Sequence, residues 1–212
     1  MNWSEFLSIG KLRTGIVLSF VWLIILAIVS PSFFEMIQRR DGFTPADPLL
    51  DILPSIDLSN IIFFILYVLV IVTVIRLARD PLRLLLGLEA YAVMMTIRFL
   101  TIYLIRFEPP PGLIALQDPL ANMFFYGQTV ITKDLFFSGH AATLFLLYFL
   151  VQHKTLRTIL LAGSVIVSLS LLVQHIHYTY DVLAAPLFAF GSYRITMRLS
   201  KIPAQGVAQY RA

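Results

Sequence analysis

The stretch FFSGHAATLFLL, residues 136–147, places a Ser-Gly-His triplet at the head of an otherwise apolar run. A second stretch, QHIHYTYDVLAA at 174–185, carries His175, His177 and Asp181 in similarly apolar surroundings. Ionisable side chains are costly next to lipid, and inside membrane segments they usually face a cavity or one another. Together the two stretches predict a polar site enclosed by a bundle of apolar helices.

The composition of the whole chain is that of a membrane protein. Of its 212 residues, 58% are hydrophobic and 13% are charged, whereas soluble domains have about 45–50% apolar and about 25% charged residues. The length allows a single integral membrane domain over residues 1–212 and no sizeable second domain. The absence of cysteine excludes a thiolate nucleophile. No basic run with interleaved aromatic residues is present, which excludes nucleic acid as a partner.

Six segments approach the length and apolar character of a spanning helix of about 20 residues. They cover approximately residues 15–34, 58–75, 84–105, 135–152, 156–174 and 179–197. The first follows Lys11 and Arg13, but its apolar run is longer than that of a signal peptide and no cleavage site follows it. The predicted fold is therefore an all-α membrane protein, a six-helix transmembrane bundle that keeps its first span.

Charge placement predicts the orientation of this bundle. With a cytoplasmic N-terminus, Lys and Arg on the cytoplasmic side outnumber those on the opposite side by 11 to 4, and Arg98 inside the third span completes the 16. The positive-inside rule then places both termini in the cytoplasm, and loops 35–57 and 106–134 and the HIHY turn outside. The compact chain favours a bacterial inner membrane with an extracytoplasmic site, although a Golgi-type membrane follows the same charge rule.

The histidines and Asp181 suit chemistry at phosphorus. His177 and Asp181 are four residues apart, so a helix that begins here places both on one face. The carboxylate can hold one imidazole nitrogen protonated and leave the other as a nucleophile or base. His140, on another helix, can protonate a leaving group. Gly139 allows close backbone approach, and the N–H groups at the start of its helix favour an anion. The scheme requires no metal and no cofactor.

Two other interpretations of these residues remain open. In one, the side chains are only polar contacts that hold the helices together. In the other, His175 and His177 bind zinc, although residues two apart point about 200° apart on a helix, so an extended turn would be needed. We expect His175 to be a neighbour that supports His177. His153 precedes a lysine in a cytoplasmic turn and is expected to be solvated.

With these residues in place, the chain resembles the type 2 phosphatidic acid phosphatase superfamily and, within it, the sphingomyelin synthase branch. That branch has Ser-Gly-His-Thr, with Ala141 replacing the Thr here, and His-Tyr-Thr-x-Asp-Val, which HYTYDV at 177–182 matches fully. IRFLTIYLIRFEPPPG at 97–112 is similar to an Arg-x-x-Thr-x-Tyr segment that ends in a Pro-rich turn. PLLDILP at 48–54 is a looser match to a Pro-Leu-Pro-Asp motif. The resemblance covers about residues 48–200.

The resemblance implies a lipid phosphotransferase with His177 as nucleophile, Asp181 as its orienting partner, and His140 as general acid and then base. It implies membrane phospholipid and lipid alcohol substrates, with a phosphocholine- or phosphoethanolamine-type headgroup passing to an acceptor such as ceramide. The residues expected around the substrate are Arg98, Asp134, Ser138, Gly139, His175 and Tyr178. A structural alternative stands for Arg98, in which its guanidinium binds backbone carbonyls or Asp134.

Two departures from the wider phosphatase pattern bear on the reaction. The Lys-(six)-Arg-Pro element is absent, and Ser170-Leu171 stands where the pattern has Ser-Arg. Those basic residues ordinarily clamp a phosphate monoester dianion, so their absence favours a phosphodiester substrate. A lipid hydrolase that uses water is the second interpretation, and a lipid-binding or lipid-moving bundle without catalysis is the third.

Overall fold

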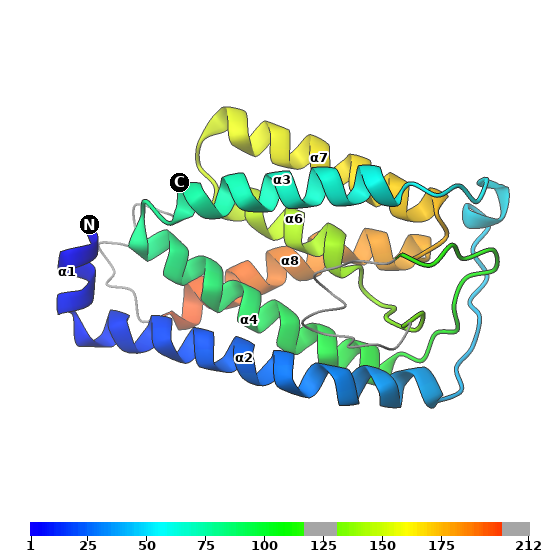
Figure 1. The fold of residues 1–212 in the computed structure, drawn as a ribbon, viewed down its shortest axis with the longest axis horizontal. Coiled ribbons are helices and arrows are strands. Elements are labelled where there is room, and N and C mark those ends of the chain that lie inside the picture. Colours follow the sequence, from blue (N-terminus) through cyan, green and yellow to red (C-terminus); the bar gives the residue numbers. More distant parts are fainter. Residues whose placement is uncertain (117–130, 201–212) are drawn as a thin grey trace.

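The computed structural model describes residues 1–116 and 131–200, and this part of the chain is helical with connecting loops (Figure 1). It contains one short 3₁₀ helix, Leu50–Ile52, and seven α-helices. The α-helices are α1 (Trp3–Ser8), α2 (Gly10–Arg39), α3 (Ser59–Leu77), α4 (Pro81–Leu104), α6 (Gly139–Leu150), α7 (Lys154–Val173) and α8 (Thr179–Leu199).

Several of these helices begin at capping residues that the sequence provides. Asp80 caps α4 by accepting the N–H of Arg83 at 3.4 Å, and Pro81 takes the first helical position, where its missing N–H costs nothing. His153 is exposed, as predicted, and its Nδ1 also accepts the N–H of Leu156 at 3.4 Å to cap α7. The polar residues between the apolar runs therefore define where the helices start.

The predicted boundaries of the fourth span are wrong. We expected a helix over 135–152, whereas α6 covers only Gly139–Leu150. Residues 135–137 are apolar, but the carbonyls of Phe136 and Phe137 accept hydrogen bonds from side chains of α4. These contacts hold the segment outside the helix, so hydropathy alone misplaced its start.

The short helix α6 forms the centre of the bundle. It packs against α3, α4, α7 and α8, most extensively against α8. Its residues Ala141, Ala142 and Leu144 are fully buried, and they face a core that includes Ala185 and Ala189 of α8. Small side chains on both helices allow the two backbones to approach closely. The site residues at the start of each helix are thereby held near one another.

The outer surface is apolar, as expected of a bundle in lipid. In the described residues, four helices (α2, α3, α4 and α7) are long and apolar enough to cross a membrane. The helix α6 has 12 residues, and α8 has 21 residues but a less apolar composition. Leu18 and Phe64 are 61% and 71% exposed, and lipid would cover such side chains. These observations support a helical membrane bundle. That the bundle has six spans stays a prediction.

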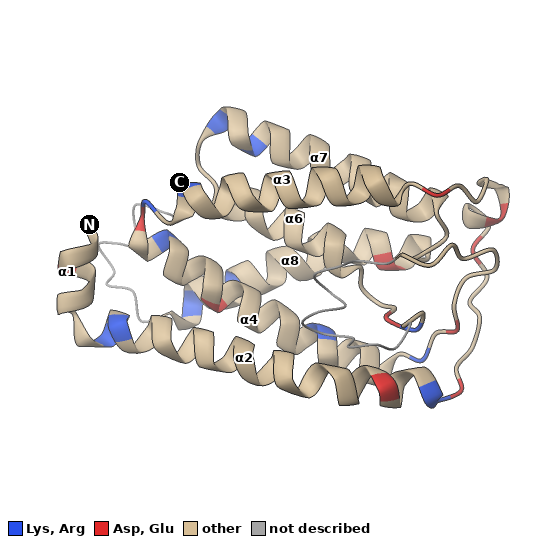
Figure 2. Cartoon of the chain, viewed as in Figure 1, with Lys and Arg blue, Asp and Glu red and all other residues tan. Residues whose placement is uncertain are grey.

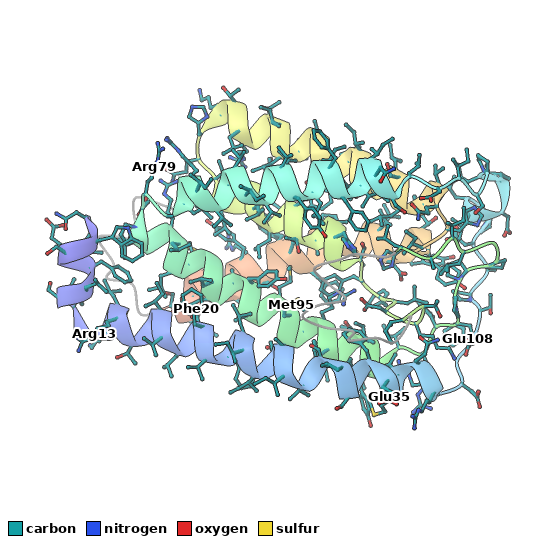
Figure 3. The ribbon with its side chains drawn as sticks, viewed as in Figure 1. Arg13, Phe20, Glu35, Arg79, Met95 and Glu108 are labelled. Atoms are coloured by element: carbon teal, nitrogen blue, oxygen red, sulfur yellow. The ribbon has the colours of Figure 1, made fainter. Side chains whose placement is uncertain are left out.

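The bundle has two chemically different ends. One end of the bundle, here called the loop end (right in Figure 1), holds the described parts of loops 35–57 and 106–134 and the turn at 174–178. Ser55 Oγ donates to the carbonyl of Gly112, which joins the two loops, and a ring nitrogen of His175 in the turn lies 3.1 Å from the carbonyl of Leu53. The opposite end, here called the terminal end, holds α1 and the last turn of α8. Lys and Arg gather at the terminal end, for example Arg13 and Arg79 (Figures 2 and 3). The shared position of the three loop segments, predicted from the charge pattern, is confirmed.

The side of the membrane that each end faces can be tested with single cysteines, because the chain has none of its own. Ile52 at the loop end is 77% exposed, and Lys154 is exposed at the terminal end. We expect a membrane-impermeant maleimide to label Ile52→Cys in intact cells and Lys154→Cys only after permeabilisation, because the positive-inside rule predicts that the terminal end is cytoplasmic. The reverse labelling pattern would contradict this orientation.

Candidate active site

His140 and His177 line the same cavity at the loop end of the bundle. The cavity has a volume of about 40 Å³, and it is lined by Leu113, Ala115, Leu116, Ile131, Thr132, Asp134, His140, Ile176 and His177. A backbone contact joins the two histidine stretches directly, because the N–H of Ser138 donates to the carbonyl of Asp181 at 3.2 Å. The structure therefore brings His140, His177 and Asp134 onto one surface, and Asp181 lies directly behind His177.

The orientation of His177 is set by the first turn of α8. Asp181 Oδ2 lies 3.1 Å from His177 Nδ1 and also accepts the backbone N–H of Tyr178 at 3.2 Å. One carboxylate thus completes the start of the helix and orients the imidazole, and both side chains are buried. With Nδ1–H donating to Asp181, the neutral ring has its lone pair on Nε2. The contact predicted from the i, i+4 spacing is present, and its catalytic role stays a prediction.

His140 is the second residue of α6, whose start faces the cavity. Ser138 caps this helix, with its Oγ accepting the N–H of Ala141 at 3.5 Å. Ser138 is fully buried and is not among the described residues that line the cavity, so the contact seen for it is a helix cap. The partial positive charge of a helix N-terminus favours an anion beside His140.

Arg98 is buried between α4 and the start of α6. Its Nη1 lies 2.8 Å from Asp134 Oδ1, and its Nε donates to the carbonyl of Phe137 at 3.1 Å. A Cβ on Gly139 would lie 2.9 Å from Arg98 Nε and 3.1 Å from its Cζ, so only glycine leaves room for the guanidinium there. Asp134 lines the cavity, and Arg98 stands behind it. These are the contacts that the structural alternative for Arg98 predicted.

Thr101, the threonine of the Arg-x-x-Thr segment, also contacts the chain just before α6. It lies one helical turn after Arg98 on the same face of α4, and its Oγ1 donates to the carbonyl of Phe136 at 3.1 Å. Phe136 has a φ of 54°, a left-handed backbone conformation that residues other than glycine rarely adopt. Adjacent carbonyls at 136 and 137 are thus held by two side chains of α4, which fixes the approach of the chain to α6.

His175 points away from the cavity, toward the loops. Its ring nitrogens lie 2.7 Å from the carbonyl of Pro111 and 3.1 Å from the carbonyl of Leu53. It has a φ of 55° immediately after α7, where the N–H groups of His175 and Ile176 bond back to Leu172 and Leu171 in the Schellman pattern. His175 therefore joins two loops to the end of α7. The zinc interpretation required the rings of His175 and His177 to face one ion, whereas both ring nitrogens of His175 face loop carbonyls.

Tyr178 supports the rim of the site instead of lining the cavity. The side chain is fully buried, its Oη donates to the carbonyl of Glu108 at 2.9 Å, and its ring packs edge-on against Phe107. Burial, together with the charge of Asp181, raises the pKa of Tyr178 to about 12. The hydroxyl therefore stays protonated and keeps donating to the loop at neutral pH.

Asp47 is the main contributor that sequence reasoning missed. It is 5% exposed, and its Oδ2 and Oδ1 accept the backbone N–H and the hydroxyl of Thr179 at 2.6 and 2.8 Å. The acidic residue of the motif PLLD is Asp51, which is exposed, whereas Leu50 of that motif is buried. The only sequence signal for Asp47 was an acidic residue before a proline, which is too common to single out.

Gln174 is a second residue that the sequence did not single out. It is fully buried, its Oε1 accepts the N–H of Leu58 at 3.0 Å, and its Nε2 donates to Ser59 Oγ at 2.8 Å and to the carbonyl of Ile114 at 3.3 Å. A glutamine at the end of an apolar helix was the available signal. The side chain ties the start of α3 and the loop after Gly112 to the end of α7.

Comparison with known proteins identifies the region that contains both histidine stretches. Residues 133–197 match the family described as PAP2 superfamily C-terminal. The match supports the PAP2 superfamily. Members of this superfamily are typically phosphatases or phosphotransferases, which supports an enzyme of this lipid-acting type. The match covers less than half of the 212 residues and leaves the sphingomyelin synthase branch a prediction. No curated protein matched the chain.

The packing of Arg98 against Gly139 predicts the effect of a single methyl group. We expect Gly139→Ala to lower the apparent melting temperature in detergent, because overpacking of this kind typically costs about 1–3 kcal/mol. Gly191→Ala on α8 is the matched control, since its Cβ would meet nothing within 4 Å. In the double variant Gly139→Ala/Arg98→Ala, the effect of the added methyl should disappear. A Gly139→Ala variant as stable as Gly191→Ala would contradict the close packing.

Asp47 predicts a pH dependence of stability. Burial alone raises its pKa, but the hydrogen bonds from Thr179 and from the backbone of its own loop outweigh burial and hold the pKa below the ordinary 3.8. A carboxyl with a lowered folded-state pKa stabilises fully above its unfolded value and loses that contribution as the pH falls through the folded-state value. We expect Asp47→Asn to lower the free energy of unfolding by about 1 kcal/mol at pH 7, because the hydrogen bonds to the charged carboxylate are weakened. Thermal midpoints of the two proteins should converge below pH 4, and a constant difference would refute this role.

Proposed function

We propose that the protein transfers a phospho-headgroup from a glycerophospholipid to a lipid alcohol such as ceramide, in the manner of the sphingomyelin synthase branch. The observation that carries the proposal is that His177, oriented by Asp181, lines the same cavity as His140 at the N-terminus of α6. In this proposal the site faces the extracytoplasmic side of a bacterial inner membrane.

The first step forms a bond between His177 Nε2 and phosphorus. Asp181 holds Nδ1–H and stabilises the positive charge that develops on the ring. The bond between phosphorus and the glyceride oxygen breaks, and the protonated His140 gives that oxygen its proton, so diacylglycerol leaves. The phospho-headgroup remains on His177, and the non-bridging oxygens lie toward the start of α6.

The second step reverses these roles. The hydroxyl of the acceptor attacks phosphorus while the now neutral His140 takes its proton, and the bond from phosphorus to Nε2 breaks. The acceptor lipid leaves with the headgroup, and both histidines return to their starting states. Atoms and charge balance without a further reactant.

The charge of the site supports a phosphodiester as substrate. Arg98 is paired with Asp134, so its positive charge is compensated within the protein. Leu171, which stands where the wider pattern has arginine, is fully buried in the core and offers no charge. A monoester dianion would leave a negative charge uncompensated in a low-dielectric site, which is costly.

The cavity walls support a lipid alcohol as acceptor. Most of its described lining side chains are apolar, among them Leu113, Leu116 and Ile176. Its volume of about 40 Å³ is far below the roughly 300–1,000 Å³ of small-molecule sites. A hydrolase that uses water is the second candidate, favoured by the superfamily match and by this small volume.

Substitutions of the three proposed catalytic residues test the roles. With purified protein in vesicles of headgroup-labelled phosphatidylcholine and ceramide, we expect His177→Ala and His140→Ala each to abolish transfer, because the residues act as a unit. Asp181→Asn should lose on the order of 10⁴-fold by analogy with hydrolase triads. His153→Ala, at the exposed cap of α7, is the control and should retain activity. Full activity of folded His177→Ala would sink the phosphohistidine scheme.

Substrate choice separates transferase from phosphatase. We expect phosphatidylcholine or phosphatidylethanolamine to be turned over much faster than phosphatidic acid, because each uncompensated charge in such a site costs several kcal/mol. Added ceramide or diacylglycerol should divert the label from free phospho-alcohol into new lipid, measured by mass spectrometry. Faster release of inorganic phosphate from phosphatidic acid would establish the phosphatase instead.

A further inference from the structure

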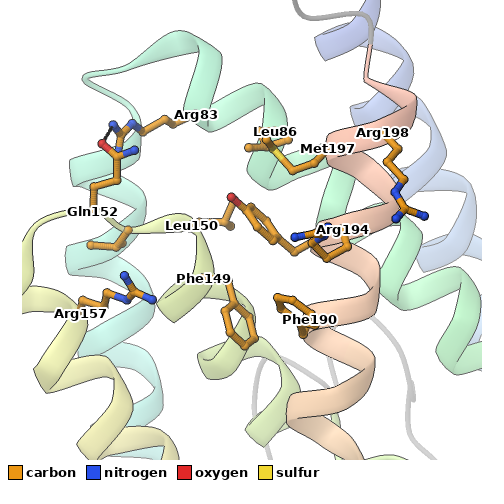
Figure 4. A pocket seen from close by; sticks show the side chains of 12 residues that line it. Arg83, Leu86, Phe149, Leu150, Gln152, Arg157, Phe190, Arg194, Met197 and Arg198 are labelled. Carbon is orange, nitrogen blue, oxygen red and sulfur yellow. Dashed lines mark hydrogen bonds between the residues drawn. The ribbon is translucent and has the colours of Figure 1, made fainter. Parts of the chain in front are cut away.

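A basic cavity lies at the terminal end of the bundle, opposite to the histidines. It has a volume of about 540 Å³ and lies between the start of α4, the turn from α6 to α7 and the last turns of α8 (Figure 4). Among its described lining residues, none is acidic and four are arginines: Arg83, Arg157, Arg194 and Arg198. Along α8, Asp181 and Arg198 are about 25 Å apart at 1.5 Å per residue, so this cavity is separate from the candidate active site.

The arginines around the cavity are mostly not neutralised by carboxylates. Arg83 is paired with Asp80 at 2.8 Å. Within residues 1–116 and 131–200, the other three form no ion pair. Arg157 lies 4.6 Å from the centre of the Tyr148 ring, and Arg194 lies 5.8 Å from that of Phe190. The aromatic rings orient these cations without removing their charge, so the cavity favours an anionic ligand.

The basic surface extends beyond this cavity. A neighbouring cavity of about 450 Å³ shares Arg83, Val151 and Gln152 with it. It adds Arg76 from the last turn of α3 and Arg79 from the turn that follows, together with one acidic residue, Asp80, the partner of Arg83. Guanidinium groups from α4, α7 and α8 therefore surround one region. Arginine forks are well suited to phosphate oxygens, which they can bind through two parallel hydrogen bonds.

An apolar stripe leads from the bilayer to the cavity. Leu183, Leu187 and Phe190 follow one face of α8 and are 63%, 71% and 45% exposed. Arg194 and Arg198 continue the same face at the end of the helix. A ligand with long apolar chains and a charged head matches this sequence of surfaces, whereas a small soluble anion would use only the arginines.

We propose that the basic cavity binds the phosphate headgroup of an anionic phospholipid from the leaflet at the terminal end, with the acyl chains against the stripe on α8. Basic pockets between membrane helices bind such headgroups through the same chemistry. The proposal does not rest on the proposed function, because the basic cavity and the candidate active site share no lining residue.

Binding of labelled lipids to the detergent-purified full chain tests the proposal. We expect fluorescent phosphatidylglycerol to bind about tenfold more tightly than the matching phosphatidylcholine at low salt, and the preference to shrink as NaCl is raised because the interaction is screened. The variant Arg194→Gln/Arg198→Gln should lose the preference. The control Arg13→Gln/Lys154→Gln removes two charges from the same end outside the basic cavity and should keep it.

Three outcomes would overturn the proposal. The first is equal binding of the two lipids by the wild-type chain at low salt, or a preference that salt does not change. The second is an unchanged preference in folded Arg194→Gln/Arg198→Gln. The third is full displacement of phosphatidylglycerol by millimolar inorganic phosphate but not by chloride at equal ionic strength, which would identify a soluble anion as the ligand. If the double variant failed to fold, the wild-type preference and its salt dependence would decide alone.

Discussion

The guanidinium of Arg98 is a full charge inside the bundle, and the geometry of the candidate active site depends on how that charge is accommodated. Asp134 compensates it, the carbonyl of Phe137 accepts its Nε–H, and Gly139 leaves room for it. Removing one partner of such a buried pair typically costs about 3–5 kcal/mol. Because these partners precede or open α6, the same contacts decide where that helix starts and where His140 stands.

The other wall of the cavity is built by hydrogen bonds at the start of α8. Asp47 accepts two hydrogen bonds from Thr179, and Asp181 bonds both the backbone of Tyr178 and His177. A satisfied polar network in a low-dielectric setting is rigid, because breaking any one bond leaves a buried group unpaired. The groups that would perform catalysis are therefore held by the same interactions that begin a helix.

The two ends of the bundle differ in whether their arginines are paired with carboxylates. At the loop end, Arg98 is the one buried arginine among the described residues, and Asp134 neutralises it. In the proposed function, this cavity takes a headgroup with a single phosphodiester charge. At the terminal end, Arg157, Arg194 and Arg198 have no carboxylate partner among the described residues, so the basic cavity suits an anion. Exposed apolar side chains cover the surface between the two ends, as expected of a bundle in lipid.

Properties that depend on nearby residues could be predicted from the sequence. Hydropathy determined the membrane class and the approximate helix positions, and the i, i+4 spacing determined the contact between His177 and Asp181. The sequence offered Asp134 as one possible partner of Arg98, and the structure decided between the alternatives. Tertiary structure alone decided the start of α6, the turn of His175 toward the loops and the role of Asp47. These features depend on contacts between segments far apart in the chain: Asp47 and Thr179, for example, are separated by 132 positions. Local periodicity carries no information about which distant carbonyl or carboxylate a side chain will meet once the helices pack.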